Sequence, residues 1–515
     1  MQLGNNSSSS AGAPSMRSAE NYFHYPTLWK VAVFLLFFFY IVAMTILFSI
    51  RSVPITGYET DGVVFMIKSR ALFTEHFSPP IFGAGVGIVF AIRFFDMIVH
   101  DTFAAGKLVS MVAGFFYLLA SLKVIKKLYA PSTGLLAALL LLVNPTVVFY
   151  STLSQSDMLA AAFLMMALWA LLDNQRDSRV FLAGLCLGLG FTVRYIYIIF
   201  ILLIFSVIRD LKGDRPQAIR KFMIGSVGFI IGSLPQIIVN VISPVFINSW
   251  RLVVLSLHNG VYDGALYTPS YVNISQQDWL RLCSLWIKRF VVHVPTVISH
   301  AAYWPAYVAV PGYIFSVRRC KQNRRLLTFW GVCIMLYLSF LSAIFFRDEP
   351  RYFLPVLPLV LASGLAMWRM LVNDKKIGII IGFTVIFLIN IFATIENTKE
   401  HIGEQAMEFK KAGIFLNANA GPHDKVLASQ PHVYFYAQRP GELFESFTRE
   451  ELENFEQSIH TRGIQWVVFD ERNGAGQCPS LLWLLDSESA RATHHGWYTV
   501  FDNKAKPRIV VWRVQ

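Results

Sequence analysis

Long apolar segments, each near the length needed to cross a lipid bilayer, recur along this chain from Val31 almost to Asn390. A helix needs about 20 predominantly apolar residues to span the hydrocarbon core of a membrane. Only 15% of the 515 residues are charged and 55% are hydrophobic, whereas about 25% of the residues of a soluble domain are charged. This pattern excludes a soluble enzyme, a disordered chain and a disulfide-rich secreted module. The sequence therefore predicts a polytopic α-helical membrane protein.

The net charge of +13 is concentrated in short loops between the apolar segments. Its densest clusters are Lys123–Lys127, Arg209–Lys221, Arg318–Arg325 and Arg369–Lys376. An excess of Lys and Arg in short loops marks the cytoplasmic side of a membrane protein. The distribution therefore argues against nucleic-acid binding and predicts that these loops are cytoplasmic.

The alternation of apolar segments and basic loops predicts about eleven spans and a cytoplasmic N-terminus. Residues 82–99 are apolar enough to cross, but a crossing there would move the Lys123–Lys127 cluster to the outer side. This segment also contains Arg93 and Asp96, so we expect it to be juxtamembrane or re-entrant. The expected spans are residues 29–50, 104–122, 133–150, 158–172, 180–193, 195–208, 222–242, 300–317, 326–346, 353–371 and 377–395.

Composition divides the chain into three parts. Residues 1–27 are polar and without periodicity, which predicts a disordered cytoplasmic tail. Residues 28–398 form the transmembrane module, with outer loops at about 51–101 and 243–299. Residues 399–515 have the composition of a soluble domain and predict an extracytoplasmic α/β domain. Its expected strands are residues 425–429, 433–437, 464–470, 497–501 and 508–514.

The first outer loop carries the acids Glu59, Asp61 and Glu75 just beyond the first span. A general base that deprotonates an acceptor hydroxyl has to lie at this membrane–water boundary if the co-substrate is a lipid. The alternative is structural, because Thr60 or Asp61 would also cap the helix that follows. The residues by themselves leave both interpretations open.

Further charged residues occur at the ends of later spans. Asp157 precedes an apolar segment and is either a functional acid or an N-cap. Arg194 lies between two short apolar segments, and Arg351 and Tyr352 open a span. A guanidinium group donates two parallel hydrogen bonds to a phosphate, so these arginines are candidates for binding a lipid phosphate. Interfacial anchoring by Arg and Tyr is the alternative.

The order of these motifs resembles the integral-membrane GT-C glycosyltransferases. The motifs that carry the resemblance are Asn144-Pro145 followed by Ser156-Asp157-Met158, then Arg194-Tyr195, and then Glu349-Pro350-Arg351-Tyr352. The similar branch contains bacterial relatives of the protein O-mannosyltransferases and of the aminoarabinose and galacturonic acid lipid A transferases. The resemblance covers about residues 29–395, and the C-terminal domain is similar to the tail of many bacterial members.

The resemblance implies a polyprenyl-phosphate-linked sugar donor and transfer at the outer membrane face. Asp61 then matches the catalytic aspartate of the first loop, and Asp157 matches the acid of the second loop. Arg351 and Tyr352 match the Arg-Tyr pair near the lipid phosphate, with Arg194 as a further candidate. Many relatives have Asp-Glu in the first loop. Here Gly62 follows Asp61, so Glu59 or Glu75 would have to supply a second carboxylate.

The resemblance thus implies a glycosyltransferase that moves a hexosyl or pentosyl group to a glycan, lipid or protein at the periplasmic face of a bacterial inner membrane. Asp61 would act as base in an inverting single displacement, with Arg351 holding the departing phosphate. We expect no cofactor and no metal-ligand cluster, and a divalent metal requirement stays open. The alternatives are a transporter or flippase of lipid-linked saccharides, which would have polar groups near mid-bilayer, and a scaffold without activity.

Overall fold

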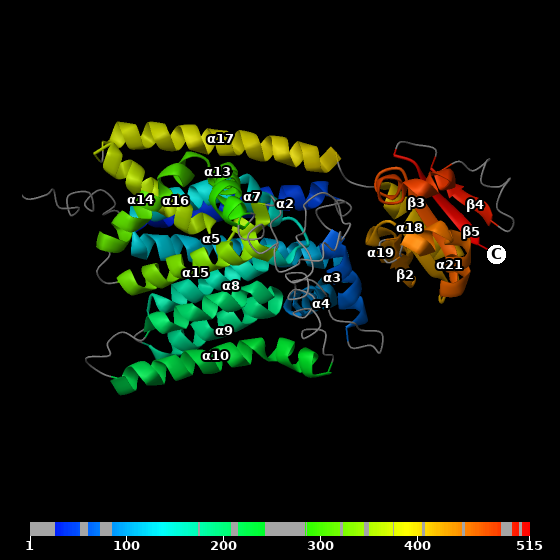
Figure 1. The fold of residues 1–515 in the computed structure, drawn as a ribbon. Coiled ribbons are helices and arrows are strands. Elements are labelled where there is room, and N and C mark those ends of the chain that lie inside the picture. Colours follow the sequence, from blue (N-terminus) through cyan, green and yellow to red (C-terminus); the bar gives the residue numbers. More distant parts are fainter. Residues whose placement is uncertain are drawn as a thin grey trace, which may run out of the picture.

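The computed structural model describes residues 26–51, 60–72, 85–173, 176–207, 215–242, 284, 286–319, 323–344, 350–373, 375–403, 407–444, 447, 449–485, 497–503 and 507–514. These residues form a helical bundle up to Gly403 and an α/β domain from Met407 onward (Figure 1). Almost all of the expected N-terminal tail and most of the expected loop at 243–299 lie outside the described residues. Glu59 and Glu75 lie outside them too.

The described helices occupy the positions of all the expected spans. They are α2 (Pro26–Ile50), α3 (Thr60–Ala71), α4 (Gly87–Val99), α5 (Thr102–Leu128), α6 (Pro131–Leu142), α7 (Pro145–Tyr150), α8 (Ser156–Leu171), α9 (Asp177–Val193), the 3₁₀ helix η2 (Tyr195–Val207), α10 (Arg215–Ile242), the π-helix η4 (Arg289–His293), α13 (Val294–Ala302), α14 (Trp304–Arg319), α15 (Arg324–Ile344), the 3₁₀ turn η5 (Pro350–Phe353), α16 (Leu357–Leu371) and α17 (Lys376–Gly403).

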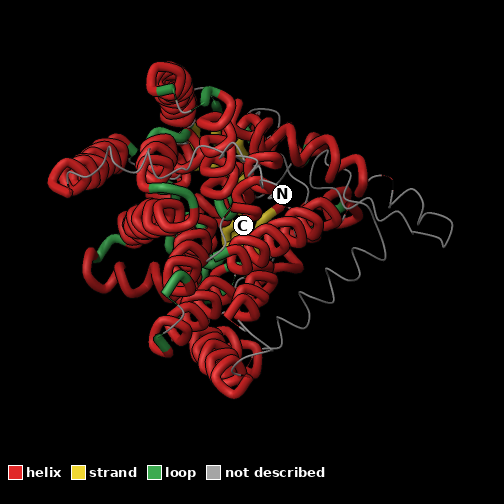
Figure 2. The backbone as a smooth tube through the Cα atoms, turned by 90° about the vertical axis from the view of Figure 1, so that its left-hand side faces the viewer, coloured by secondary structure: helices red, strands yellow, loops and turns green. Residues whose placement is uncertain are grey.

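Five of the described helices are long and apolar enough to cross a membrane: Trp29–Ile50, Thr102–Leu128, Pro216–Val239, Arg324–Ser342 and Ile377–Glu400. Four apolar helices are shorter, among them η2. A 3₁₀ helix rises about 2.0 Å per residue, so the 13 residues of η2 extend about 26 Å. In Figure 2 the helices of the bundle are seen end-on, from the side opposite to the C-terminal domain.

One expected span is broken in two, at the junction of α6 and α7. The Asn144 side chain accepts hydrogen bonds from the backbone N–H groups of Thr146 and Val147 and so caps α7. Pro145 follows at the first helical position, where its missing N–H leaves no bond unmade. The Asn-Pro motif therefore ends one helix and begins the next.

The helix α4 lies in the segment for which we expected no crossing. Its 13 residues extend about 20 Å, which is less than the hydrocarbon thickness of about 30 Å. Ile88 and Ile92 are buried against the bundle, whereas Phe94 and Met97 are exposed. The juxtamembrane or re-entrant position of this segment stays a prediction.

The C-terminal domain is a five-stranded sheet between two helical layers. Its elements are α18 (Met407–Asn419), β1 (Lys425–Ala428), α19 (Pro431–Ala437), β2 (Gly441–Leu443), α20 (Arg449–Glu453), α21 (Phe455–Arg462), β3 (Ile464–Asp470), α22 (Gly474–Gln477), the 3₁₀ helix η7 (Pro479–Leu485), β4 (Trp497–Asp502) and β5 (Ile509–Val514). The strand order is β2-β1-β3-β5-β4, with β1 parallel to β2 and β3, and β5 antiparallel to its neighbours. The helices α18 and α19 cover one face, and α21 and η7 cover the other.

The expected strand at residues 433–437 is wrong. These residues lie in the helix α19, and the strand that pairs with β1 is β2, further along the chain. Pro431 is placed at the start of the helix, where its fixed φ angle favours helical backbone. Val433 and Ala437, four residues apart, then lie on the same helix face and are both buried in the core of the domain. The run of aromatic residues had suggested a strand.

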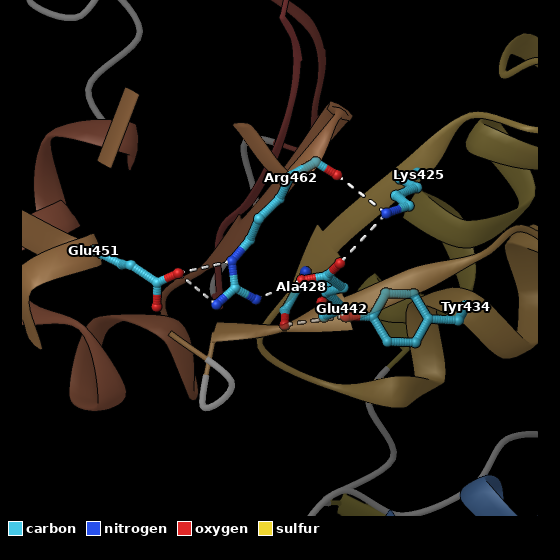
Figure 3. Close-up of polar contacts among 6 residues, drawn as sticks. All are labelled: Lys425, Ala428, Tyr434, Glu442, Glu451 and Arg462. Carbon is cyan, nitrogen blue, oxygen red and sulfur yellow. Dashed lines mark hydrogen bonds and ion pairs between the residues drawn. The ribbon is translucent and has the colours of Figure 1, made fainter. Parts of the chain in front are cut away.

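A network of charged side chains holds the short edge strand β2 (Figure 3). Nη1 of Arg462 lies 2.7 Å from Glu442 Oε2, and its Nη2 lies 2.6 Å from Glu451 Oε1. Lys425 Nζ donates to the Arg462 carbonyl at 3.1 Å, and the Tyr434 hydroxyl donates to the Glu442 carbonyl. These contacts tie three residues of edge strand to β1, α19 and α21.

Candidate functional site

Asp61 lies in the first turn of α3, where the helix dipole favours a negative charge. The helix begins one residue earlier, at Thr60, so Asp61 is inside the helix rather than its N-cap. Its side chain is 55% exposed, and Oδ2 lies 3.4 Å from Nη1 of Arg351. Asp61 of the first loop therefore contacts Arg351, which lies 290 positions later in the chain, in the turn η5.

Asp157 and Arg194 form a buried ion pair. Asp157 lies in the first turn of α8, which begins at Ser156, and Arg194 is the C-cap of α9. Nη2 of Arg194 donates to Asp157 Oδ2 at 2.6 Å, with side-chain exposures of 10% and 6%. The start of α8 and the end of α9 are neighbours, because these two helices pack side by side. Asp157 is thus an ion-pair partner and not an N-cap.

Arg351 lies at the centre of the site, in the turn η5. Besides the contact with Asp61, its Nη1 donates to Gln155 Oε1 at 3.2 Å and lies 3.9 Å from Asp157 Oδ2. Its side chain is only 7% exposed. A buried guanidinium group that contacts two carboxylates does not act as an anchor in the lipid headgroup region. The anchoring alternative is therefore disfavoured for Arg351.

The Tyr352 ring lies near both guanidinium groups. Its centroid is 5.2 Å from Cζ of Arg351 and 5.7 Å from Cζ of Arg194, within the range of cation–π interactions. The Tyr352 hydroxyl lies 3.5 Å from Nη2 of Arg351. The structure thus brings together Asp61, Asp157, Arg194, Arg351 and Tyr352, which come from four separate segments of the sequence.

Gln155 is a member of this site that the sequence analysis missed. It is fully buried and precedes α8, and its side-chain oxygen binds Arg351. The signal was present, because Ser154, Gln155 and Ser156 form a polar run between apolar helices. Polar residues in such a place need hydrogen-bond partners, and a functional site often supplies them.

Gly62 permits the close packing of α3 against the loop before α8. A Cβ atom at this position would lie 2.1 Å from the carbonyl oxygen of Ser154. No side chain fits there without a shift of one backbone against the other. The glycine that replaces the expected second carboxylate therefore has a structural role, since it lets the preceding residue, Asp61, approach Arg351.

Two further basic residues fix the C-terminal end of α2 beside the loop before α8. Nη1 of Arg51 donates to the Thr152 carbonyl at 2.6 Å. Lys107 Nζ donates to the carbonyls of Phe48 and Arg51 at 2.7 and 2.8 Å. A cation at these last carbonyls complements the negative end of the α2 dipole. Arg51 and Lys107 therefore bind backbone carbonyls of the protein itself and hold the end of α2 in place.

The buried part of the site contains more positive than negative charge. Arg194 and Arg351 are both buried, whereas Asp157 is the buried carboxylate between them and Asp61 is half exposed. Guanidinium groups donate charge-assisted hydrogen bonds to anionic ligands such as carboxylates and phosphates. Among the described residues no group of three or more His, Cys, Asp or Glu could hold a metal ion.

A family model for dolichyl-phosphate-mannose-protein mannosyltransferases matches residues 84–247. The matched segment includes Asp157 and Arg194, and it ends before Arg351. A sequence comparison with characterised proteins finds no significant match.

Solved structures with the same fold extend this likeness to most of the chain. ArnT from Cupriavidus metallidurans bound to undecaprenyl phosphate has a TM-score of 0.64 at 12% identity, over 93% of this chain and 97% of that chain. Its apo state gives a TM-score of 0.59 with the same coverage. The oligosaccharyltransferase of Archaeoglobus fulgidus, in complex with Zn and sulfate, has a TM-score of 0.52 at 13% identity, over 84% of this chain and 67% of that chain.

These findings define the class of the protein: it is a multi-pass membrane protein with the GT-C glycosyltransferase fold. Within that class it resembles the protein mannosyltransferases in its central segment and ArnT over nearly its whole length. The resemblance that the sequence motifs indicated is therefore confirmed.

Proposed function

We propose that this protein is a glycosyltransferase that moves a hexosyl or pentosyl group from a polyprenyl-phosphate-linked donor to a glycan, lipid or protein acceptor. The observation that carries the proposal is the contact of Asp61 with Arg351, beside the Arg194–Asp157 pair. The structure of ArnT with bound undecaprenyl phosphate supports a polyprenyl phosphate as the lipid carrier.

In the proposed reaction Asp61 accepts the proton of the acceptor hydroxyl, whose oxygen attacks the anomeric carbon of the donor. The new carbon–oxygen bond forms as the bond from the anomeric carbon to the phosphate oxygen breaks. The electron pair leaves with the polyprenyl phosphate, and the configuration of the anomeric carbon is inverted. A half-exposed carboxylate suits the role of base, because the acceptor can reach it from the water side.

The arginines would stabilise the charge that develops on the departing phosphate. Arg351 and Arg194 are held in place before substrate arrives, so little reorganisation is needed during the reaction. Asp157 would act as a positioning residue, because it binds Arg194 and lies near Arg351. Tyr352 would line the phosphate site between them. Glu59 and Glu75 stay candidates for a supporting acid, and the phosphate leaving group makes a cofactor unnecessary.

The orientation that we propose has the C-terminal domain in the periplasm and the N-terminus in the cytoplasm of a bacterial inner membrane. The domain contacts α3, whose Arg70 binds Thr102 at the start of α5. The cluster Lys123–Lys127 lies near the opposite end of α5, and this helix of 27 residues is about 40 Å long. A basic cluster in the last turns of α5 supports a cytoplasmic position for this end and an outer position for the domain.

The proposal is tested by lipid mass spectrometry on purified protein in lipid nanodiscs. Wild type and Asp61→Asn are incubated with undecaprenyl-phosphate sugars and a periplasmic extract as acceptor source. We expect the wild type to release undecaprenyl phosphate while one sugar mass appears on another molecule. The variant should lose at least about 100-fold in rate, the scale of general base catalysis.

Equal turnover in wild type and variant would remove Asp61 as the base. Absence of any covalent product, together with movement of a labelled polyprenyl-phosphate sugar across proteoliposome membranes by both proteins, would contradict a transferase and support a flippase. Thermal unfolding of both proteins serves as control, because a half-exposed side chain should be replaceable without loss of the fold.

A further inference from the structure

The C-terminal domain contacts the bundle through the helix α19, which packs against α3 (Figure 1). Phe435 of α19 is almost fully buried and belongs to the apolar core of the bundle. In return, Ile67 of α3 packs against the apolar core of the C-terminal domain. Each of the two parts therefore places an apolar side chain against the core of the other, at the helix that carries Asp61.

Arg70 of α3 connects this interface to the helices α5 and α4. Its Nη1 donates to the Phe435 carbonyl at 3.0 Å, and its Cζ lies 4.2 Å from the centre of the Phe435 ring. Its Nε donates to Thr102 Oγ1 at the start of α5, at 3.0 Å. The Thr102 hydroxyl in turn donates to Asp96 of α4. One guanidinium group thus holds α19 against α3 and ties both to the rim of the bundle.

Asp61 and Arg70 lie at opposite ends of the same helix. The two residues are nine positions apart along the helix, which corresponds to a rise of about 14 Å. The Asp61 end is held by the close approach of Gly62 to Ser154, and the Arg70 end is held by α19. A helix of this length moves as a rigid body, so a tilt at one end changes the position of the other. A misplacement of about 1 Å in an active site can reduce turnover about 100-fold.

We infer that docking of the C-terminal domain fixes the position of α3, and that Arg70 is the positioning residue through which docking aligns Asp61 for catalysis. The catalytic part of this inference rests on the proposed function. Arg70 itself touches neither the acceptor nor the phosphate site, which is formed by Arg351, Arg194 and Tyr352. Its removal should therefore change the rate of the chemical step and leave donor binding intact.

The inference is tested with Arg70→Gln, Phe435→Ala and the double variant. We expect each single change to lower kcat about 10- to 100-fold, with a KM for the donor and an affinity for undecaprenyl phosphate that stay within about twofold. The double variant should lose less than the sum of the two single losses, because both changes remove the contact between the Arg70 guanidinium group and the Phe435 ring. Arg70→Lys should recover part of the rate, since an amine can still reach one carbonyl.

Arg508→Gln is the matched control. Arg508 donates to both carboxylate oxygens of Asp502 and links the ends of β4 and β5 within the C-terminal domain, outside the helix α19 that docks on α3. This change should lower the stability of the domain and leave kcat per folded molecule unchanged. If Arg70→Gln alters kcat and KM no more than Arg508→Gln does, Arg70 has only a structural role and the inference is overturned.

Hydrogen exchange of the α3 amides separates this inference from the proposed function. Exchange in residues 60–71 should become faster in Arg70→Gln and in Phe435→Ala, but not in Arg508→Gln. This result supports docking as the constraint on α3 even if the wild type transfers no sugar from any donor, an outcome that would overturn the proposed function alone. Unchanged exchange of α3 in both variants would contradict the docking inference whatever the activity.

Discussion

Oδ2 of Asp61 lies 3.4 Å from Nη1 of Arg351, although 290 positions separate the two residues in the chain. The proposed base and the arginine proposed to bind the phosphate are thus paired with each other in this structure. A donor phosphate would compete with Asp61 for the same guanidinium group. Binding of the donor would then release the carboxylate from its partner before the acceptor hydroxyl arrives.

Replacement of Arg351 should weaken donor binding. In Arg351→Gln the phosphate loses a charged hydrogen-bond donor, which contributes about 1.5–3 kcal/mol, so the KM for the donor should rise about 10- to 100-fold. Arg351→Lys keeps the charge but loses the planar fork, and we expect an intermediate value. Steady-state kinetics with varied donor concentration measures this. A KM that is unchanged in both variants would argue against a phosphate at Arg351.

Removal of the buried carboxylate of Asp157 should destabilise the bundle. Asp157→Asn leaves Arg194 without its counter-charge in a buried position, and breaking a buried pair in this way costs about 3–5 kcal/mol. The matched control is Asp177→Asn, because Asp177 pairs with Arg220 on the exposed surface. There we expect a loss of about 0–1 kcal/mol. Denaturation in detergent compares the two, and equal losses would contradict the prediction.

A side chain at position 62 should displace α3. The Cβ of Gly62→Ala would lie 2.1 Å from the Ser154 carbonyl oxygen, so the two backbones must separate and Asp61 moves with its helix. We expect a strong loss of transfer activity and a lower Tm. Gly190→Ala is the control, since its Cβ would meet its nearest neighbour at 3.6 Å and Ala is the better helix former by about 1 kcal/mol. Full activity of Gly62→Ala would show that the close approach is not needed.

We expect the stability of the folded protein to depend on pH because of Lys68. Burial lowers the pKa of its amine from 10.5 to about 8, so the folded protein loses this proton at a lower pH than the unfolded chain does. The cost of burying the charged amine is therefore present below about pH 8 and is relieved as the pH rises toward 10.5. The Tm of the wild type, relative to that of Lys68→Met, should rise over this interval. A constant Tm difference from pH 7 to 10.5 would contradict a lowered pKa.

The sequence predicted the helices of the bundle because their signal is local. A run of apolar residues has to leave water wherever it lies in the chain, so its length and its basic flanks predict a span by themselves. The local preferences of single residue types gave a wrong prediction at α19. Its aromatic and β-branched residues favour a strand, whereas Pro431 and the spacing of Val433 and Ala437 fit the helix that packs on the sheet.

The sequence by itself determined the membrane class, the resemblance to GT-C transferases and the residue types available for catalysis. Only the tertiary structure decided that Asp157 pairs with Arg194 and that Gln155 joins Arg351. It also decided that α19 docks on the helix of Asp61. The physical reason is that hydrophobic periodicity specifies which face of a helix leaves water, but not which other helix it meets. Those contacts depend on packing between segments far apart in the chain, such as the missing Cβ of Gly62 against the Ser154 carbonyl.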